Sequence, residues 1–180
     1  NGLNLIEDTG DKGNGYNFVE TDDNLTVFAK LKKVEIAEQS EFFATFKVTS
    51  VIDIPAGMDE NKNRTNETIS HTVTSYVTIR NNSRRLDFKL NINNQSENHR
   101  LRTLFKTEID TPFVYADGQF DLIKRNIQPD KMWENPCYNQ RLQAFVSVED
   151  EKSGFMVASR GLNSYEVLRD GKNTVALTLL

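Results

Sequence analysis

The chain has few of the side chains that build metal centres and disulfides. Its 180 residues include one cysteine, Cys137, and two histidines, His71 and His99. A single cysteine cannot close an internal disulfide, which favours a reducing compartment, and we expect a cytoplasmic protein. Three soft ligands far apart in the chain are too few for a structural zinc site, so we expect neither a metal ion nor another cofactor in this segment. The two histidines read as ordinary polar residues, His71 at a strand end and His99 in a turn.

Long apolar runs and an excess of positive charge are also absent. No segment approaches the roughly 20 apolar residues that span a bilayer. Asp and Glu number 26 against 22 for Lys and Arg, so the net charge is −4. This balance argues against nucleic acids and anionic membrane surfaces as partners.

Common catalytic and ion-binding motifs are missing as well. No G-x-S-x-G, P-loop or G-x-G-x-x-G sequence occurs. The acidic stretch at residues 7–15, EDTGDKGNG, resembles a calcium loop but lacks the D-x-D-x-D-G spacing and the closing Glu that encircle the ion. Adjacent acidic residues such as Asp22 and Asp23 point apart in a strand, so we do not expect them to form an acid/base pair.

What the sequence does contain is alternation of apolar and polar residues. The alternating segments cover residues 25–31, 42–48, 73–79 and 86–92. Such period-2 patterns predict half-buried antiparallel strands. Further alternating segments flank the turn signals EDEKSG and Asp170-Gly171, which are typical of hairpins. No convincing amphipathic helix of about ten or more residues is present. We therefore predict an all-β antiparallel sandwich, a single domain over residues 1–180 with little helix.

Three polar stretches interrupt the alternation, at residues 7–23, 53–69 and 126–140. Loops of this length usually bind something or pack on a neighbour. The third carries the only Trp, Trp133, which we expect to be a largely covered anchor. The chain starts without Met and ends on the apolar VALTLL, so we expect it to be part of a longer polypeptide.

Two neighbouring segments show unusual polar faces. Residues 113–125, FVYADGQFDLIKR, read as one strand with a small apolar face and a face that carries Asp117 and Asp121. Residues 98–109, NHRLRTLFKTEI, place apolar side chains at odd positions and mostly polar ones at even positions. We expect these strands to pair antiparallel, with the aspartates opposite Arg100 and Arg102. The polar faces are then either a solvated surface or an interface with another domain.

The same segments resemble a known family. NHRLRTLFKTEI and FVYADGQFDLIKR are similar to paired motifs in the C-terminal region of glycoside hydrolase family 38, the α-mannosidases. The upstream EDTGDKGNGYNF resembles the acidic, Gly-rich run that follows the catalytic part of these enzymes. The later stretches QAFVSVED, GFMVASRGLNSYEV and NTVALTLL match in the same order, closest to the bacterial branch.

The resemblance implies a division of labour. Family 38 enzymes are retaining α-mannosidases whose aspartate nucleophile and zinc ligands lie in an N-terminal α/β domain. None of that domain is present here, so no catalytic or metal residue is carried over, and we expect the segment alone to be inactive. The C-terminal region of the family is a large sandwich of the galactose-mutarotase-like kind, which packs on the catalytic domain and helps shape its pocket. The implied partners are the protein's own catalytic domain and a mannoside substrate; a homo-oligomer is also possible.

One site residue follows from the resemblance. In the family, the tyrosine of the Gly-rich run approaches the bound sugar, and Tyr16 of GNGYNF occupies that place. Some members have G-A-Y there, and a loop tyrosine that caps the sandwich is the alternative. Asp8 and Asp11 either support this loop or serve ordinary turn chemistry.

Two other functions stay open at this point. A stand-alone carbohydrate-binding module would show an exposed cluster of aromatic rings, which only Trp133, Tyr138 and Tyr115 could supply. A mutarotase-like enzyme would need a histidine and a carboxylate that converge in an open groove, with His99 at its centre.

Overall fold

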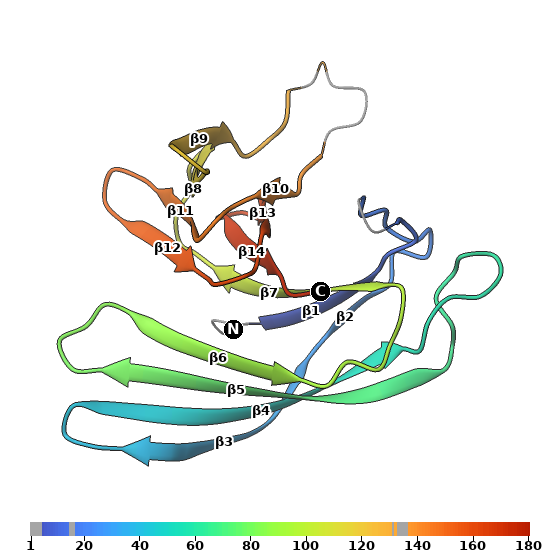
Figure 1. Ribbon diagram of the computed structural model, residues 1–180, viewed down its shortest axis with the longest axis horizontal. Helices are drawn as coiled ribbons and strands as arrows, with labels where there is room; N and C mark the ends of the chain where they lie inside the picture. Colours follow the sequence, from blue (N-terminus) through green and yellow to red (C-terminus); the bar gives the residue numbers. More distant parts are fainter. Residues whose placement is uncertain (1–4, 15–16, 131, 133–136) are drawn as a thin grey trace. The chain divides into compact units, whose positions relative to one another are not determined.

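The computed structural model describes residues 5–14, 17–130, 132 and 137–180, and these are strands, turns and irregular segments without a helix. None of the described segments is therefore a helix that could cross a membrane. The strands are β1 (Leu5–Gly10), β2 (Thr26–Phe28), β3 (Lys30–Gln39), β4 (Phe43–Pro55), β5 (Thr68–Arg80), β6 (Leu86–Ile92), β7 (His99–Lys106), β8 (Phe113–Asp117), β9 (Leu122–Asn126), β10 (Gln140–Arg141), β11 (Phe145–Glu149), β12 (Gly154–Ala158), β13 (Ser164–Leu168) and β14 (Thr174–Thr178) (Figure 1). The expected all-β antiparallel class is confirmed.

The described chain divides into two compact units. The N-terminal unit comprises residues 7–100, and the C-terminal unit comprises residues 101–180 with the beginning of β1. Strands β1 and β7 each contribute residues to both units.

The N-terminal unit is built around a long four-stranded sheet in the order β3-β4-β5-β6 (Figure 1). Strands β4 and β5 pair antiparallel over their full length, from Phe43 opposite Arg80 to Pro55 opposite Thr68. Their β-branched and aromatic residues suit a pleated sheet. The other pair in this unit joins β1 to the short β2.

This sheet has one apolar and one polar face. A row of opposed residues runs across the four strands, and its members are Ile36, Phe46, Val77 and Phe88. The next residue on each strand points to the other face, and that row is Glu35, Lys47, Tyr76 and Lys89. Part of the apolar face is open to solvent, since Ile36 is 61% and Val34 52% exposed. The alternation predicted for β4, β5 and β6 is thus confirmed.

The C-terminal unit is a sandwich of two antiparallel sheets. Strands β10, β13, β14 and β7 follow one another in the six-stranded sheet β10-β13-β14-β7-β1-β2, and the other sheet has the order β12-β11-β8-β9. Apolar side chains of both sheets are buried, and the rings of Phe105 on β7 and Phe155 on β12 contact each other at 6.2 Å between centroids. The hairpins expected at EDEKSG and Asp170-Gly171 are confirmed as β11–β12 and β13–β14.

The expected pairing of residues 98–109 with 113–125 is wrong. The second segment is not one strand but the hairpin β8–β9, closed by a bond from the Gly118 amide to the Asp121 carbonyl. Strand β8 pairs on its other side with β11, whereas β7 pairs with β14. The cross-strand ion pairs between aspartates and arginines therefore do not form.

The Asp117 carboxylate instead holds the backbone of a distant segment. It accepts hydrogen bonds from the amides of Gln143, Ala144 and Phe145, at 3.0, 2.9 and 2.9 Å. Asp117 is the last residue of β8, and these bonds fix the start of the neighbouring strand β11. Arg102, which was expected on the same polar interface, is buried and pairs with Glu166 on β13 at 2.6 Å.

Candidate functional site

A buried ionic cluster lies in the N-terminal unit beside the Gly-rich segment. Asp8 of β1 is fully buried, and its carboxylate faces two basic side chains. The Arg64 guanidinium donates to Oδ2, and the Nδ1 atom of His99 lies 2.5 Å from Oδ1. The side chains of Arg64 and His99 are 2% and 3% exposed. Because a buried charge is costly unless it is paired, the three side chains hold one another in place.

The same cluster joins two further segments of the unit. Arg64 also donates from Nη1 to the Leu25 carbonyl at 3.0 Å. The Nε2 atom of His99 lies 3.0 Å from Oδ1 of Asn94, whose amide orientation is set by bonds to the Ser96 backbone. Both ring nitrogens of His99 thus have hydrogen-bond partners. The cluster fixes β1, the 56–67 loop and the start of β7 to one another.

His99 therefore meets a carboxylate, as a mutarotase-like site would require, but not in an open groove. Asp8 and His99 are buried and their polar atoms are engaged by neighbours. A substrate has no access to such a pair, so the geometry does not support that chemistry. The interpretation of His99 as a turn residue is also wrong, because it begins β7.

His71 is likewise a buried structural residue rather than a strand-end surface group. It is 2% exposed, its Nδ1 lies 2.9 Å from the Ile69 carbonyl, and its Nε2 accepts from the Gln95 amide at 3.1 Å. The two contacts fix the tautomer with the hydrogen on Nδ1.

The Gly-rich segment that follows β1 is closed by its own hydrogen bonds. The Asp11 carboxylate accepts from the amides of Gly13 and Val19, at 2.9 and 3.0 Å. The Lys12 amide donates to the Val19 carbonyl at 2.8 Å. At Gly13 an added Cβ would lie 1.9 Å from the Asn17 carbonyl oxygen, so only glycine fits. The expectation that Asp11 supports this loop is confirmed.

The residue predicted to approach the sugar, Tyr16, lies outside the described residues. The flanking positions are described: the Asn14 amide donates to the Asn17 carbonyl at 3.2 Å, and the Asn17 amide donates to the Asn14 side chain at 3.1 Å. Phe18 is covered by the Arg100 guanidinium, whose carbon lies 3.4 Å from the ring centroid, a cation–π contact. Sequence reasoning missed this contact because the two residues are far apart in the chain.

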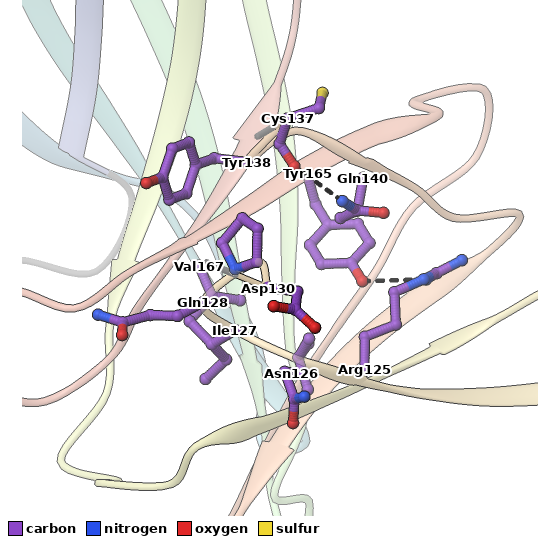
Figure 2. Close-up of a pocket in the computed structure, with 12 residues that line it drawn as sticks. Arg125, Asn126, Ile127, Gln128, Asp130, Cys137, Tyr138, Gln140, Tyr165 and Val167 are labelled. Atoms are coloured by element: carbon purple, nitrogen blue, oxygen red, sulfur yellow. Dashed lines mark hydrogen bonds between the residues drawn. The ribbon is translucent and has the colours of Figure 1, made fainter. Parts of the chain in front are cut away.

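The C-terminal unit contains a cavity of about 340 Å³ between its β8–β9 hairpin, β13 and the segment after β9 (Figure 2). Tyr165 of β13 is 1% exposed and lines it. Its phenol oxygen accepts a hydrogen bond from Nη1 of Arg125 at 3.1 Å. Burial raises the pKa of Tyr165, an effect that the nearby Arg125 opposes. Tyr138 and Cys137 also line the cavity, and Cys137 is an exposed free thiol.

The aromatic residues named for a stand-alone binding module do not all fall on this cavity. Tyr138 lines it, whereas the Tyr115 ring lies 5.5 Å from Nζ of Lys124 on the β8–β9 hairpin. Trp133 lies outside the described residues, so its expected burial stays a prediction.

Among the described residues, no three His, Cys, Asp or Glu side chains are grouped so that they could hold a metal ion. The Asp8 cluster consists of one carboxylate and one imidazole beside an arginine, a donor set that does not fit a zinc ion.

The described residues thus form an all-β antiparallel architecture, with a two-sheet sandwich in one unit and a long amphipathic sheet in the other. The whole of residues 1–180 matches the model of the glycosyl hydrolases family 38 C-terminal domain, and the chain belongs to this family. The resemblance read from the sequence is confirmed.

Known proteins agree with this assignment. An α-mannosidase from Enterococcus faecalis V583 superposes with a TM-score of 0.90 at 34% identity, over 99% of this chain and 22% of that one. A glycosyl hydrolase family 38 protein from Enterococcus faecalis gives a TM-score of 0.86 at 32% identity, over the same shares. A Halalkalibacterium halodurans protein named "Putative mannosylglycerate hydrolase" is 29% identical over 99% of this chain and 21% of its own length. The chain thus spans about a fifth of the length of these relatives.

Proposed function

We propose that this chain is the non-catalytic C-terminal domain of a retaining α-mannosidase that hydrolyses terminal α-mannosides. The match to the family 38 C-terminal domain over all 180 residues carries this proposal. The names of the relatives support the activity, and the short share of their length supports a larger enzyme. The nucleophile, the acid/base carboxyl and the zinc ion are assigned to the catalytic domain.

The open apolar face of the β3–β6 sheet supports a packing role. Val34 and Ile36, both on the edge strand β3, are more than half exposed on this apolar face. Contiguous apolar patches on a protein surface mark interaction sites, and their burial contributes roughly 25 cal/mol per Å². We assign the catalytic domain of the same polypeptide as the partner that covers this face.

We further propose that the Gly-rich segment presents Tyr16 to the substrate. The family resemblance of GNGYNF supports this role, and so does the closed hydrogen-bonded frame around it. The buried Asp8 cluster anchors the strand from which the segment starts. The catalytic domain would supply the chemistry and this segment one edge of the pocket.

The deciding experiment compares the intact polypeptide with the isolated 180 residues. We expect the intact protein to hydrolyse an aryl α-mannoside with retention of configuration, and the isolated chain to show no turnover and no tight zinc binding. Retaining hydrolysis needs two carboxyls about 5 Å apart, and a catalytic zinc needs about three protein ligands. Turnover by the isolated chain would overturn the division of labour.

The name of the Halalkalibacterium halodurans relative favours a second candidate substrate, mannosylglycerate. Both substrates share the α-mannosyl group and differ in the leaving group. The assay should therefore compare kcat/KM for the aryl α-mannoside, an α-linked mannobiose and mannosylglycerate. Hydrolysis of none of the three would refute the proposed activity.

A further inference from the structure

The cavity of the C-terminal unit has the size and the polar lining of a small-ligand site. Its volume of about 340 Å³ lies at the lower end of the range of about 300–1,000 Å³ that is typical of ligand pockets. Val114 and Val167 are among its apolar lining residues. The polar side chains of Arg125, Asp130 and Gln140 also line it (Figure 2). A few convergent polar groups on an apolar wall are what orients a bound ligand.

Two adjacent hydrogen-bond donors stand at one side of the cavity. Arg125 uses Nη1 for the Tyr165 oxygen, at 3.1 Å, and for the Arg141 carbonyl, at 3.4 Å. Within the described part of the chain, neither the Tyr165 hydroxyl hydrogen nor Nη2 of Arg125 has a hydrogen-bond acceptor. Tyr165 is 1% exposed, and a buried hydroxyl that lacks an acceptor is costly. A ligand oxygen placed between Tyr165 and Arg125 would satisfy both donors.

The other polar groups of the lining suit a ligand with hydroxyl groups better than a charged ligand. The lining contains one cation, Arg125, and one anion, Asp130, so its charges balance. Asp130 offers a carboxylate, of which Oδ1 accepts from the Met132 amide at 3.0 Å. Gln140 offers an amide that donates to the Cys137 carbonyl at 3.0 Å and has its oxygen for another donor. A ring that carries several hydroxyls matches a lining that offers both donors and acceptors.

We propose that this cavity is an accessory binding site for a neutral, hydroxyl-rich ligand of the size of one pyranose ring. Tyr165 and Arg125 donate to a ligand oxygen, and Asp130 and Gln140 accept from its hydroxyls. Tyr138, at the mouth of the cavity, supplies an aromatic ring for the apolar face of the sugar. The site is built from residues of the C-terminal unit alone, so it does not depend on the activity of the enzyme.

Binding in the cavity can be followed through the chemical reactivity of Cys137. It lines the cavity, and its thiol is exposed. The intact polypeptide is treated with a limiting thiol reagent, and the modification rate of Cys137 is followed by peptide mass spectrometry. The probe is methyl α-D-mannopyranoside up to 100 mM, compared with glycerol and with sodium D-glycerate. Occupancy of the cavity shields the thiol, so we expect the mannoside to slow modification at least threefold.

Variants distinguish binding in this cavity from binding at any other sugar site of the enzyme. Arg125→Gln and Asp130→Asn should each abolish the protection, whereas Lys124→Gln, the neighbour of Arg125 that does not line the cavity, should keep it. Asp130 is exposed, so its isosteric change leaves folding intact even where Arg125→Gln does not. Absence of protection in the parent, equal protection by glycerol, stronger protection by glycerate, or protection that survives in Asp130→Asn would each overturn the proposal.

Discussion

Nδ1 of His99 lies 2.5 Å from Oδ1 of Asp8, and both side chains are almost completely buried. The two residues are 91 positions apart in the chain, at the start of β7 and in β1. The second oxygen of Asp8 binds Arg64, so one carboxylate holds two basic side chains that reach it from different segments. The contact therefore ties β1 to the start of β7 within the N-terminal unit.

The first prediction follows from this arrangement. Asp8→Asn removes the only carboxylate of the cluster and leaves Arg64 and His99 buried without it. Loss of one partner of a buried ion pair costs about 3–5 kcal/mol, so we expect the free energy of unfolding to fall by that order. Urea denaturation followed by tryptophan fluorescence and circular dichroism measures it. The control is Asp22→Asn. Asp22 pairs with Lys12, and its side chain is 80% exposed, so this change should lower the free energy of unfolding by less than about 1 kcal/mol. Equal effects of the two substitutions would contradict the assigned role.

The second prediction concerns acid stability and Asp117. Burial would raise the pKa of Asp117, but hydrogen bonds from the amides of Phe145, Ala144 and Gln143 outweigh it and hold the pKa below its ordinary value of 3.8. A carboxyl whose pKa is depressed in the folded state stabilises the fold above its unfolded pKa, and this contribution is lost as pH falls through the folded pKa.

Asp117→Asn removes this titration. We expect the variant to be less stable than the parent at pH 6, with the difference in urea midpoint shrinking as pH falls below about 4. Asp121→Asn, at the other end of the same turn, should follow the parent at every pH. A parent and an Asp117→Asn variant with parallel stability curves from pH 6 to pH 2.5 would rule out the proposed hydrogen-bonded state.

Most strands and two hairpins could be predicted from the sequence, but the β8–β9 hairpin was missed. The strands of the β3–β6 sheet and the hairpins β11–β12 and β13–β14 were predicted because alternation and turn signals are local features of the chain. The β8–β9 hairpin was read as one strand because alternation of small and large residues continues through its turn, DGQFD. The turn is closed by the local bond from the Gly118 amide to the Asp121 carbonyl, and the Asp117-Gly118 pair is a turn signal that the one-strand interpretation passed over. The bonds that the amides of residues 143–145 donate to Asp117 are long-range, and nothing local in the sequence indicates them.

The candidate site was predictable to a smaller extent. The resemblance of EDTGDKGNGYNF identified the segment, and the support from Asp11 followed from short-range turn chemistry. The Asp8–Arg64–His99 cluster was missed because partners 56 and 91 positions away are chosen by the tertiary fold. The cavity at Tyr165 and Arg125 was missed for the same reason, since its walls come from separate strands.

The third prediction tests the packing role of the apolar sheet face. Ile36→Thr replaces a 61% exposed apolar side chain, so it should change the unfolding free energy of the isolated chain by no more than about 0.5 kcal/mol. In the intact polypeptide the same change should lower the melting temperature by several degrees, because there the side chain is covered and its burial is lost. The control is Glu35→Thr, on the opposite face of the same strand, which should be mild in both forms. An intact protein that tolerates Ile36→Thr as well as Glu35→Thr would place the interface elsewhere.

The fourth prediction concerns Tyr16 in the intact enzyme. If its hydroxyl donates to a hydroxyl of the mannosyl group, and the bond tightens in the transition state, its loss lowers kcat/KM and not only substrate affinity. We expect Tyr16→Phe to reduce kcat/KM for an α-mannoside by one to two orders of magnitude, with about 1.4 kcal/mol for each tenfold loss, while the melting temperature stays unchanged. Tyr115→Phe, on the β8–β9 hairpin, is the matched control and should retain full activity. A Tyr16→Phe enzyme with parental kcat/KM would assign Tyr16 to the alternative role of capping the sandwich. A variant that loses activity and melting temperature together would show that the hydroxyl acts on the fold rather than on the sugar.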